Sequence, residues 1–290
     1  MFVLDILTYQ VQTNSVQLMI VNKLLKKNFM YKNKKIIYDI MSVLLALISI
    51  FSLIIFGKLA NLYFLIKLHT VFLLITYVLT KLFSRFCPNN RIQQDKDNLK
   101  TLGYEYLVGL FPVIIWNAPM TAFLTSDYPK QWLNFNYDPT NGTLLFVLQV
   151  VAHQFVHDIY VFSIHKYMLH SRYFWFMHKP HHIKTPSLIT AFTLSVWENA
   201  IQSIDMIIIA NIFRMHYDAF MTSFLLACVV GLYSHLGFDL FPSWWNKSIF
   251  TCWHISTSYH DLHHSQGKCN YGYILTWWDH LTGSYKSNKI

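Results

Sequence analysis

The chain has 290 residues, of which 54% are hydrophobic, 17% aromatic and only 13% charged, and its mean hydropathy is +0.31. A soluble domain carries about 25% charged residues, so this composition is typical of a protein with several membrane-spanning helices. The formal net charge of +9 comes from basic residues between apolar runs, as expected for cytoplasmic loops. We therefore do not expect nucleic-acid binding.

Apolar runs long enough to cross about 30 Å of hydrocarbon follow one another along the chain. They span residues 37–56, 61–80, 104–125, 143–164, 187–213 and 218–238. The last two form a tight pair before the tail, 239–290. The sequence predicts an all-α fold, a polytopic membrane helical bundle. We divide it into an N-terminal cytosolic segment, an N-terminal transmembrane region and a catalytic domain, at residues 1–36, 37–142 and 143–290.

The basic residues predict how the bundle is oriented. Lysines crowd the end of residues 1–36, and residues 81–100 carry five lysines or arginines, so both segments are placed in the cytosol. Counting crossings from there brings residue 165 and the tail to the same side. No basic region with a small-residue cleavage site opens the chain, so the first membrane helix is expected to be an uncleaved anchor.

The pattern H-x-x-H-H occurs twice, in "FMHKPHH" (His178, His181 and His182) and in "YHDLHH" (His260, His263 and His264). Positions i, i+3 and i+4 share a helix face, so the second triplet is expected to point at one centre. Proline is tolerated only in the first turn of a helix. Because of Pro180, we expect His178 just before a helix that contains His181 and His182.

Nine histidines suit two metal ions, because neutral imidazole is the commonest biological metal ligand. A structural zinc ion would need four ligands, usually with thiolates, and the cysteines are not placed for that. Nine of the clustered histidines would form a histidine-rich di-metal cap on the cytosolic side. The cluster consists of His153, His157, His165, His170, His178, His181, His182, His235, His260, His263 and His264.

Other polar residues near these histidines are candidates for supporting roles. His157, Asp158 and Asp261 are expected to hold ligands in place through hydrogen bonds. Glu198 either bonds a ligand histidine or caps polar groups, and the sequence leaves both open. Isolated histidines are more often structural, a role we expect for His69, His153, His216, His254 and His280.

At these residues the chain resembles the fatty acid hydroxylase/sterol desaturase superfamily. "HDIYVFSIHKYMLH", "HKPHH", "YSHLGFD" and "HDLHH" follow its histidine boxes in order, and "NYGYILTWWDHLTGSY" is similar to its ending. "SVWENAIQSIDM" is most similar to the sterol-oxidising members. Lys166 stands where arginine is usual, His280 where arginine or lysine is common, and Pro180 is unusual in its box. These departures bear on the substrate more than on the metal.

The resemblance implies a membrane-bound non-haem di-iron oxygenase. Two iron ions would use O2 to hydroxylate or desaturate a lipid, in the first place a sterol. The nine ligands that the resemblance implies for them are His165, His170, His178, His181, His182, His235, His260, His263 and His264. Electrons would come from NAD(P)H through cytochrome b5 and its reductase, in the endoplasmic reticulum of a eukaryote. One alternative is a fatty acid or sphingolipid hydroxylase of the same superfamily. Another is a metal-handling membrane protein, whose ligands should lie near the bilayer midplane on broken helices.

Overall fold

The computed structural model describes residues 74–75, 77–92, 142–188, 190–241, 244–245, 248 and 253–287. The predicted segment 1–36, the apolar runs 37–56 and 104–125, most of the run 61–80, and His69 lie outside the described residues. The three-part division of the chain therefore stays a prediction. Within the described residues every regular element is a helix, which confirms the all-α prediction.

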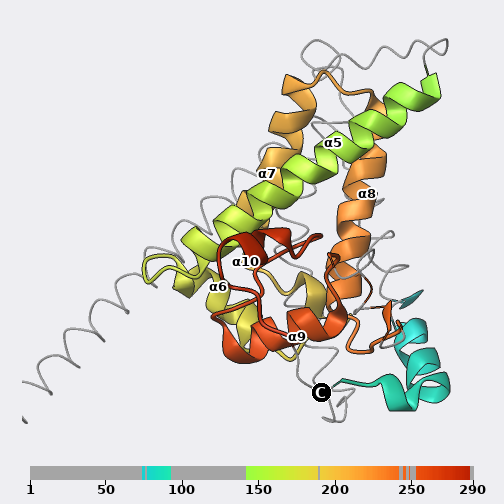
Figure 1. The fold of residues 1–290 in the computed structure, drawn as a ribbon, viewed down its shortest axis with the longest axis vertical. Helices are drawn as coiled ribbons and strands as arrows, with labels where there is room; N and C mark the ends of the chain where they lie inside the picture. The colour runs from blue at the N-terminus through green and yellow to red at the C-terminus, as the bar shows by residue number, and fades with distance from the viewer. Residues whose placement is uncertain are drawn as a thin grey trace, which may run out of the picture. The chain divides into compact units, whose positions relative to one another are not determined.

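Three long helices, α5, α7 and α8, form the apolar part of the described structure (Figure 1). Helix α5 spans Gly142–Ser163 and continues into a π-helical segment, η3, at Ile164–Leu169. Helix α7 spans Val196–Ile212, and α8 spans Tyr217–Ser234. The runs predicted at 143–164 and 218–238 are thus helices.

The start of α7 differs from the prediction, which placed an apolar run from residue 187. Residues 187–188 and 193–195 instead lie outside α7, and a 3-10 helix, η4, spans Thr190–Phe192. Ser195 caps the helix, because its hydroxyl accepts a hydrogen bond from the Glu198 amide at 3.1 Å. The amides of the first helical turn have no partner within the helix, and the serine hydroxyl accepts a hydrogen bond from one of them. Ser195 therefore fixes where α7 begins, which hydropathy alone misplaced.

Two helical stretches, Gly142–Leu169 and Tyr217–Ser234, are long and apolar enough to cross a membrane. Their outer surfaces leave large apolar side chains exposed, among them Leu144 (71%), Val151 (59%) and Leu225 (58%). Water disfavours exposed apolar surface of this kind, whereas lipid does not. The pattern suits a bundle whose outer face meets hydrocarbon.

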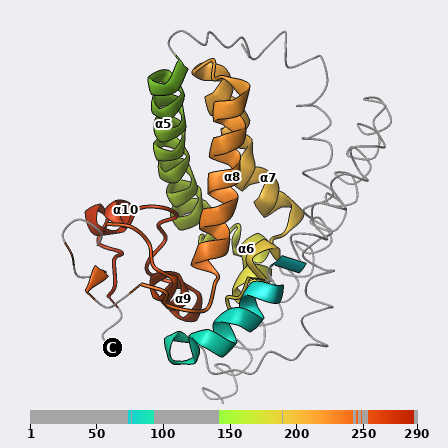
Figure 2. The same ribbon diagram turned by 90° about the vertical axis from the view of Figure 1, so that its right-hand side faces the viewer.

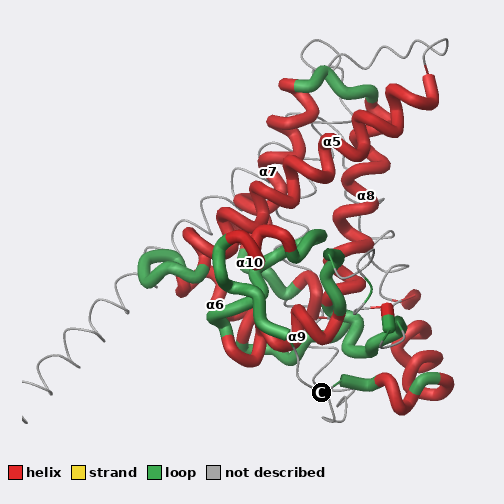
Figure 3. Tube along the Cα trace, viewed as in Figure 1, coloured by secondary structure: helices red, strands yellow, loops and turns green. Residues whose placement is uncertain are grey.

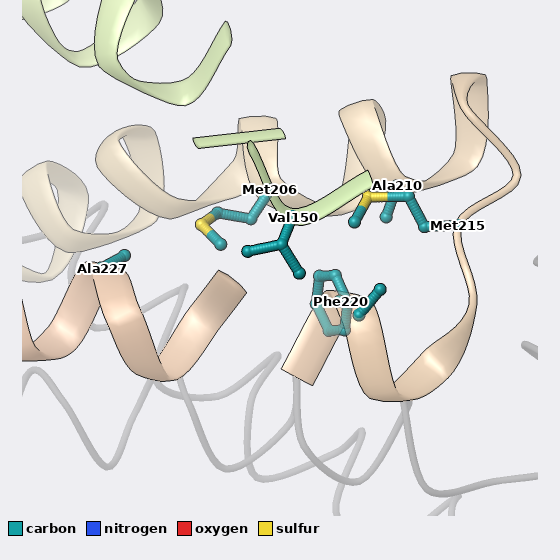
Figure 4. Packing of buried hydrophobic residues seen from close by; sticks show 7 residues of the cluster. Val150, Met206, Ala210, Met215, Phe220 and Ala227 are labelled. Carbon is teal, nitrogen blue, oxygen red and sulfur yellow. The ribbon is translucent and has the colours of Figure 1, made fainter. Parts of the chain in front are cut away.

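Helix α5 packs against both α7 and α8, as two views at right angles show (Figures 1 and 2). The buried cluster between the three helices is drawn in Figure 4 and consists of Val150, Met206, Ala210, Met215, Ala219, Phe220 and Ala227. The alanines let the helix backbones approach closely, which is how apolar helices gain packing energy where lipid competes for the same surface.

Short helices and loops form a cap where α5 and α8 end (Figure 3). The cap contains α6 (Trp175–His182), α9 (Thr257–Gln266) and α10 (Trp277–Leu281). A further helical segment, 77–86, is followed by η1 (Pro88–Asn90), and the Asn90 amide donates to the Asp239 carbonyl at 2.6 Å. The described segment therefore continues as helix six residues past the predicted run 61–80.

The position of Pro180 corrects one expectation. Helix α6 begins at Trp175, so Pro180 lies inside it and His178 lies one turn into the helix instead of before it. The preceding turn already makes helix-like backbone bonds, since the amides of Trp175 and Met177 donate to the carbonyls of Ser171 and Phe174 at 2.9 Å. The helix is therefore established before the proline, whose missing N–H removes one bond.

Candidate metal centre

The nine predicted ligands come together in two groups. A five-histidine cluster consists of His165, His170, His178, His182 and His263, and a four-histidine cluster consists of His181, His235, His260 and His264. Within each cluster one nitrogen atom from every ring lies within 4.8 Å of the others. Each cluster can therefore hold one metal ion.

Each H-x-x-H-H triplet divides between the two clusters, which corrects the expectation that the second triplet points at one centre. In α6, His178 and His182 join the five-histidine cluster and His181 joins the other. In α9 the division is reversed: His260 and His264 join the four-histidine cluster and His263 crosses to the five-histidine cluster.

The division follows from helix geometry. At 3.6 residues per turn, positions i and i+4 are about 40° apart around the axis, whereas i+3 lies about 60° to the other side of i. One ion can therefore lie on each side of the contact between α6 and α9. Each ion is reached by two histidine rings (i and i+4) from one helix and by one ring (i+3) from the other. The three rings of one triplet therefore spread over enough of the helix circumference to reach two metal ions.

The remaining three rings are presented where helices end. His165 is the second residue of the π-helical segment that extends α5, and His170 terminates that segment. His235 follows the last residue of α8. These side chains point across the end of the helical bundle. The two clusters therefore lie at the shared end of α5 and α8 and not halfway along these helices.

Hydrogen bonds to carbonyl oxygens fix which nitrogen of several rings carries the proton. The Nδ1 atoms of His165, His263 and His235 donate to the carbonyls of Tyr271 (3.0 Å), Cys269 (2.7 Å) and Gly231 (2.9 Å). A carbonyl oxygen can only accept, so Nδ1 is protonated and Nε2 keeps its lone pair. These rings are in the tautomer that a metal ion requires.

The Nε2 lone pairs of neighbouring rings then face one another with no proton between them. This arrangement is unfavourable in a buried site. The Nε2 atoms of His182 and His263 lie 3.1 Å apart, although each Nδ1 faces a carbonyl oxygen. In the other cluster Nε2 of His235 lies 3.2 Å from Nε2 of both His181 and His260. Two nitrogens at this separation can both reach one ion, because a metal–imidazole bond is about 2.1 Å long. The residues present therefore fit a metal ion in each cluster.

Burial keeps these imidazoles neutral. Removal from water lowers the pKa of His170 to about 2 and the pKa values of His182 and His235 to about 4. The pKa values of His178, His181, His260, His263 and His264 are lowered well below the ordinary value of 6.5 for the same reason, and neighbouring imidazoles add to the effect. At neutral pH the rings are thus available as ligands without the loss of a proton.

Glu198 contacts a ligand directly, which decides between the two roles that the sequence left open. Its Oε1 lies 2.5 Å from Nδ1 of His178, and the carboxylate is fully buried. The Gln202 amide donates to the same oxygen at 3.0 Å. A carboxylate behind a metal-binding histidine fixes the orientation of the ring and raises its basicity.

Of the other supporting residues, His157 and Asp158 are buried on α5 but contact no ring of the clusters among the described residues. Asp158 accepts hydrogen bonds from the Ile274 amide and from the Trp278 indole, both at 2.7 Å, and so ties the tail to α5. His157 pairs with Asp205. Asp261 lies on α9 and belongs to neither cluster.

Asp205 and Asp279 are two buried carboxylates that the sequence interpretation missed. Asp279 accepts hydrogen bonds from the amides of Tyr271 (3.0 Å) and Gly272 (2.7 Å) and from the Tyr259 hydroxyl. It therefore shapes the loop whose carbonyls orient His165 and His263. The Trp-Asp pair within "NYGYILTWWDHLTGSY" is the signal that could have identified it.

The isolated histidines of the described part stay outside both clusters. His153 contacts the Met206 carbonyl at 3.2 Å, and His216 accepts a hydrogen bond from the Asp218 amide at the start of α8. His254 lies against Trp245, and His280 stacks on Tyr285 with ring centroids 3.9 Å apart. Each contact gives the ring a structural role.

A cavity opens between α5, α7 and α8 and ends at the clusters. Its walls include ligand rings from both, namely His165, His178, His181, His235 and His260. Away from the rings it is lined mainly by apolar side chains such as Val161, Met206 and Phe224. Along α8 the lining runs from Phe224 to His235, which is about 16 Å at 1.5 Å per residue. An elongated apolar molecule can therefore reach both clusters from inside the bundle.

Comparison with known protein families finds a match over the part of the chain that contains this site. Residues 150–284 match the family model of fatty acid hydroxylases. They contain all nine rings and the cavity, so the match to this family covers the whole site and supports the resemblance that the histidine boxes predicted.

Several curated relatives are sterol enzymes. The chain is 25% identical to mouse cholesterol 25-hydroxylase over 196 residues, which are 64% of this chain and 59% of the relative. It is 27% identical to rat lathosterol oxidase over 150 residues, 51% of this chain and 48% of the relative. It is 25% identical to a Delta(7)-sterol 5(6)-desaturase of Aspergillus fumigatus over 226 residues, 70% and 65% of the two chains. The matches thus span between about half and two thirds of these relatives. No solved structure matched the chain.

Proposed function

We propose that the protein is a membrane-bound oxygenase that uses two iron ions and O2 to oxidise a C–H bond of a sterol. The observation that carries the proposal is the pairing of two clusters of neutral imidazole lone pairs with an apolar cavity that ends on them. Imidazole suits iron as well as zinc and copper, so the donor atoms permit iron, and the hydroxylase and oxidase names of the relatives support this choice.

Iron bound at both clusters would supply the activation of O2 and the oxidation of an unreactive C–H bond. The chain's own residues prepare the site. Carbonyl oxygens hold the Nδ1 protons of His165 and His263, so that both Nε2 lone pairs face the cluster. Glu198 orients His178. The apolar cavity excludes water and holds a hydrocarbon beside the rings.

We assign the sterol from the relatives, whose names include a sterol hydroxylase, a sterol oxidase and a sterol desaturase. The product is accordingly an alcohol or an alkene. A fatty acid or sphingolipid substrate is the alternative within the same family. A metal transporter is disfavoured, because the clusters lie at helix ends and not halfway along the apolar helices.

We further propose that the cap faces the cytosol of a eukaryotic endoplasmic reticulum and receives electrons from NAD(P)H through cytochrome b5 and its reductase. Basic side chains near the cap support this orientation: Lys166, Arg172, Lys179 and Lys184 all lie between the end of α5 and the start of α7. An acidic electron donor would meet a surface of opposite charge there.

The proposal is tested by expression in a host that lacks sterol hydroxylases, under isotopically labelled O2. A new sterol that carries one labelled oxygen atom is the expected result. A new double bond without label would make the protein a desaturase. Labelled hydroxyacyl chains with unchanged sterols would contradict the sterol assignment and move the protein to the fatty acid branch.

A further inference from the structure

One buried polar pair inside the apolar bundle makes no hydrogen bond to the clusters or to the tail among the described residues. Ionisable side chains among the apolar helices α5 and α7 are costly to bury and call for an explanation. Asp158 binds the tail, Glu198 binds His178, and His153 binds a backbone carbonyl. His157 and Asp205 remain: Nδ1 of His157 lies 2.6 Å from Oδ2 of Asp205, and both side chains are about 95% buried.

His157 faces the cavity. It is one of the lining residues, and it packs edge-on against the Tyr273 ring at a centroid distance of 5.4 Å. The carboxylate of Asp205 accepts the Nδ1 proton, which leaves the Nε2 lone pair. Among the described residues Nε2 has no hydrogen-bond partner. His157 thus presents to the cavity a ring nitrogen that can accept a hydrogen bond. The other polar lining residues outside the clusters are Asn199, Gln202, Ser203, Ser234 and Tyr273.

The position of this acceptor relative to the clusters is set by α5. His157 precedes the ligand His165 by eight residues, or about 12 Å along the helix. The chain order of α7 agrees: Asp205 follows Glu198, which contacts the clusters, by seven residues, or about 10 Å. The acceptor therefore lies at the inner end of the cavity, and the histidine clusters lie at the other end.

We propose that His157 binds the hydroxyl group of the sterol substrate, and that Asp205 positions the ring. This inference rests on the proposed function and adds an orientation to it. A sterol is a rigid hydrocarbon with a hydroxyl at one end, so a hydroxyl held at Nε2 directs the opposite end to the clusters. The carbon that is oxidised is then remote from the hydroxyl, and not one beside it.

The test compares two substrates, cholesterol and the same sterol without its hydroxyl, on the iron-loaded enzyme in lipid nanodiscs. Wild type is expected to favour cholesterol in kcat/KM by at least about 10-fold, because the deoxy sterol leaves a buried acceptor unsatisfied. The double variant His157→Phe/Asp205→Leu removes the polar pair without stranding a charge. It is expected to lose this preference, to oxidise more than one position, and to keep its full iron content.

Two further variants separate binding from general damage. Asp205→Asn keeps an oxygen that accepts the Nδ1 proton, so it is expected to retain most of the preference. Tyr160→Phe removes a hydrogen bond from α5 to the Ile201 carbonyl of α7 outside the cavity, so any loss should be equal for both sterols. An equal loss for both sterols in the double variant would overturn the inference and leave the proposed function intact. A wild-type enzyme that oxidises acyl chains and neither sterol would overturn both.

Discussion

Helices α6 and α9 carry the same H-x-x-H-H pattern, yet they are fixed in different ways. Helix α9 is defined by its own neighbours: the Ser256 hydroxyl accepts from the Tyr259 amide, and Gly267 ends the helix with φ of 65°. Helix α6 has no side-chain cap and contains Pro180, but its His178 is held by Glu198 from α7. Neighbouring residues in the sequence therefore fix α9, whereas a contact with another helix, α7, fixes α6.

The largest effect is expected from variants that test how the triplets divide. His181→Ala/His264→Ala removes two rings from the four-histidine cluster, so about one iron ion per chain should remain. His181→Ala/His182→Ala removes one ring from each cluster and leaves three and four rings, so it should retain more iron than the first variant. Both should abolish product formation. Iron analysis of purified protein checks this, and equal iron content in the two variants would contradict the division.

Acid is expected to act on both helices alike. Burial lowers the pKa of His182 on α6 from 6.5 to about 4 and the pKa of His263 on α9 well below 6.5, so the unfolded chain binds protons that the folded chain does not. Stability of the metal-free protein is therefore complete above pH 6.5 and falls as pH drops from 6.5 to about 4. A shift of this size corresponds to about 3 kcal/mol for one ring. Thermal unfolding across this pH range measures it, and an unchanged Tm would contradict it.

Glu198→Ala should weaken the α6 side of the site by removing the carboxylate behind His178. Loss of such a partner typically costs about 10- to 100-fold in metal affinity or activity. Glu198→Gln keeps an oxygen that can accept the hydrogen bond from Nδ1 of His178. Its iron affinity should lie between those of Glu198→Ala and the wild type. The measurement is iron affinity by competition with a chelator. Wild-type affinity in Glu198→Ala would show that α6 does not depend on α7.

The smallest effect is expected from Gly267→Ala, which tests the local end of α9. A side chain at this φ is strained by about 1 kcal/mol, although no atom of the described residues lies within 4 Å of the added Cβ. The Tm should fall by a few degrees with little change in iron content. Ser265→Ala, at an exposed position of the same helix, is the matched control and should leave the Tm unchanged.

The parts of the fold that the sequence predicted are those whose signals are local. Apolar length placed α5 and α8, spacing identified the two triplets, and the family resemblance completed the set of nine histidines. The division of the triplets was missed, because it depends on where α6 and α9 lie relative to each other. The start of α6 was wrong since the Pro180 rule ignored the turn that precedes it. The pairing of His157 with Asp205 joins residues 48 positions apart, which no local pattern reveals.

The tail that Asp158 fastens to α5 has a consequence for how the protein matures. Residues 271 and 269 supply the carbonyls that orient His165 and His263, and Asp158 and Asp279 hold that loop in place. During synthesis the N-terminal parts of a chain fold first. The membrane helices can therefore be inserted long before the site is complete. Metal loading becomes a late event, and a chain that stops short of residue 279 should reach the membrane as an empty scaffold.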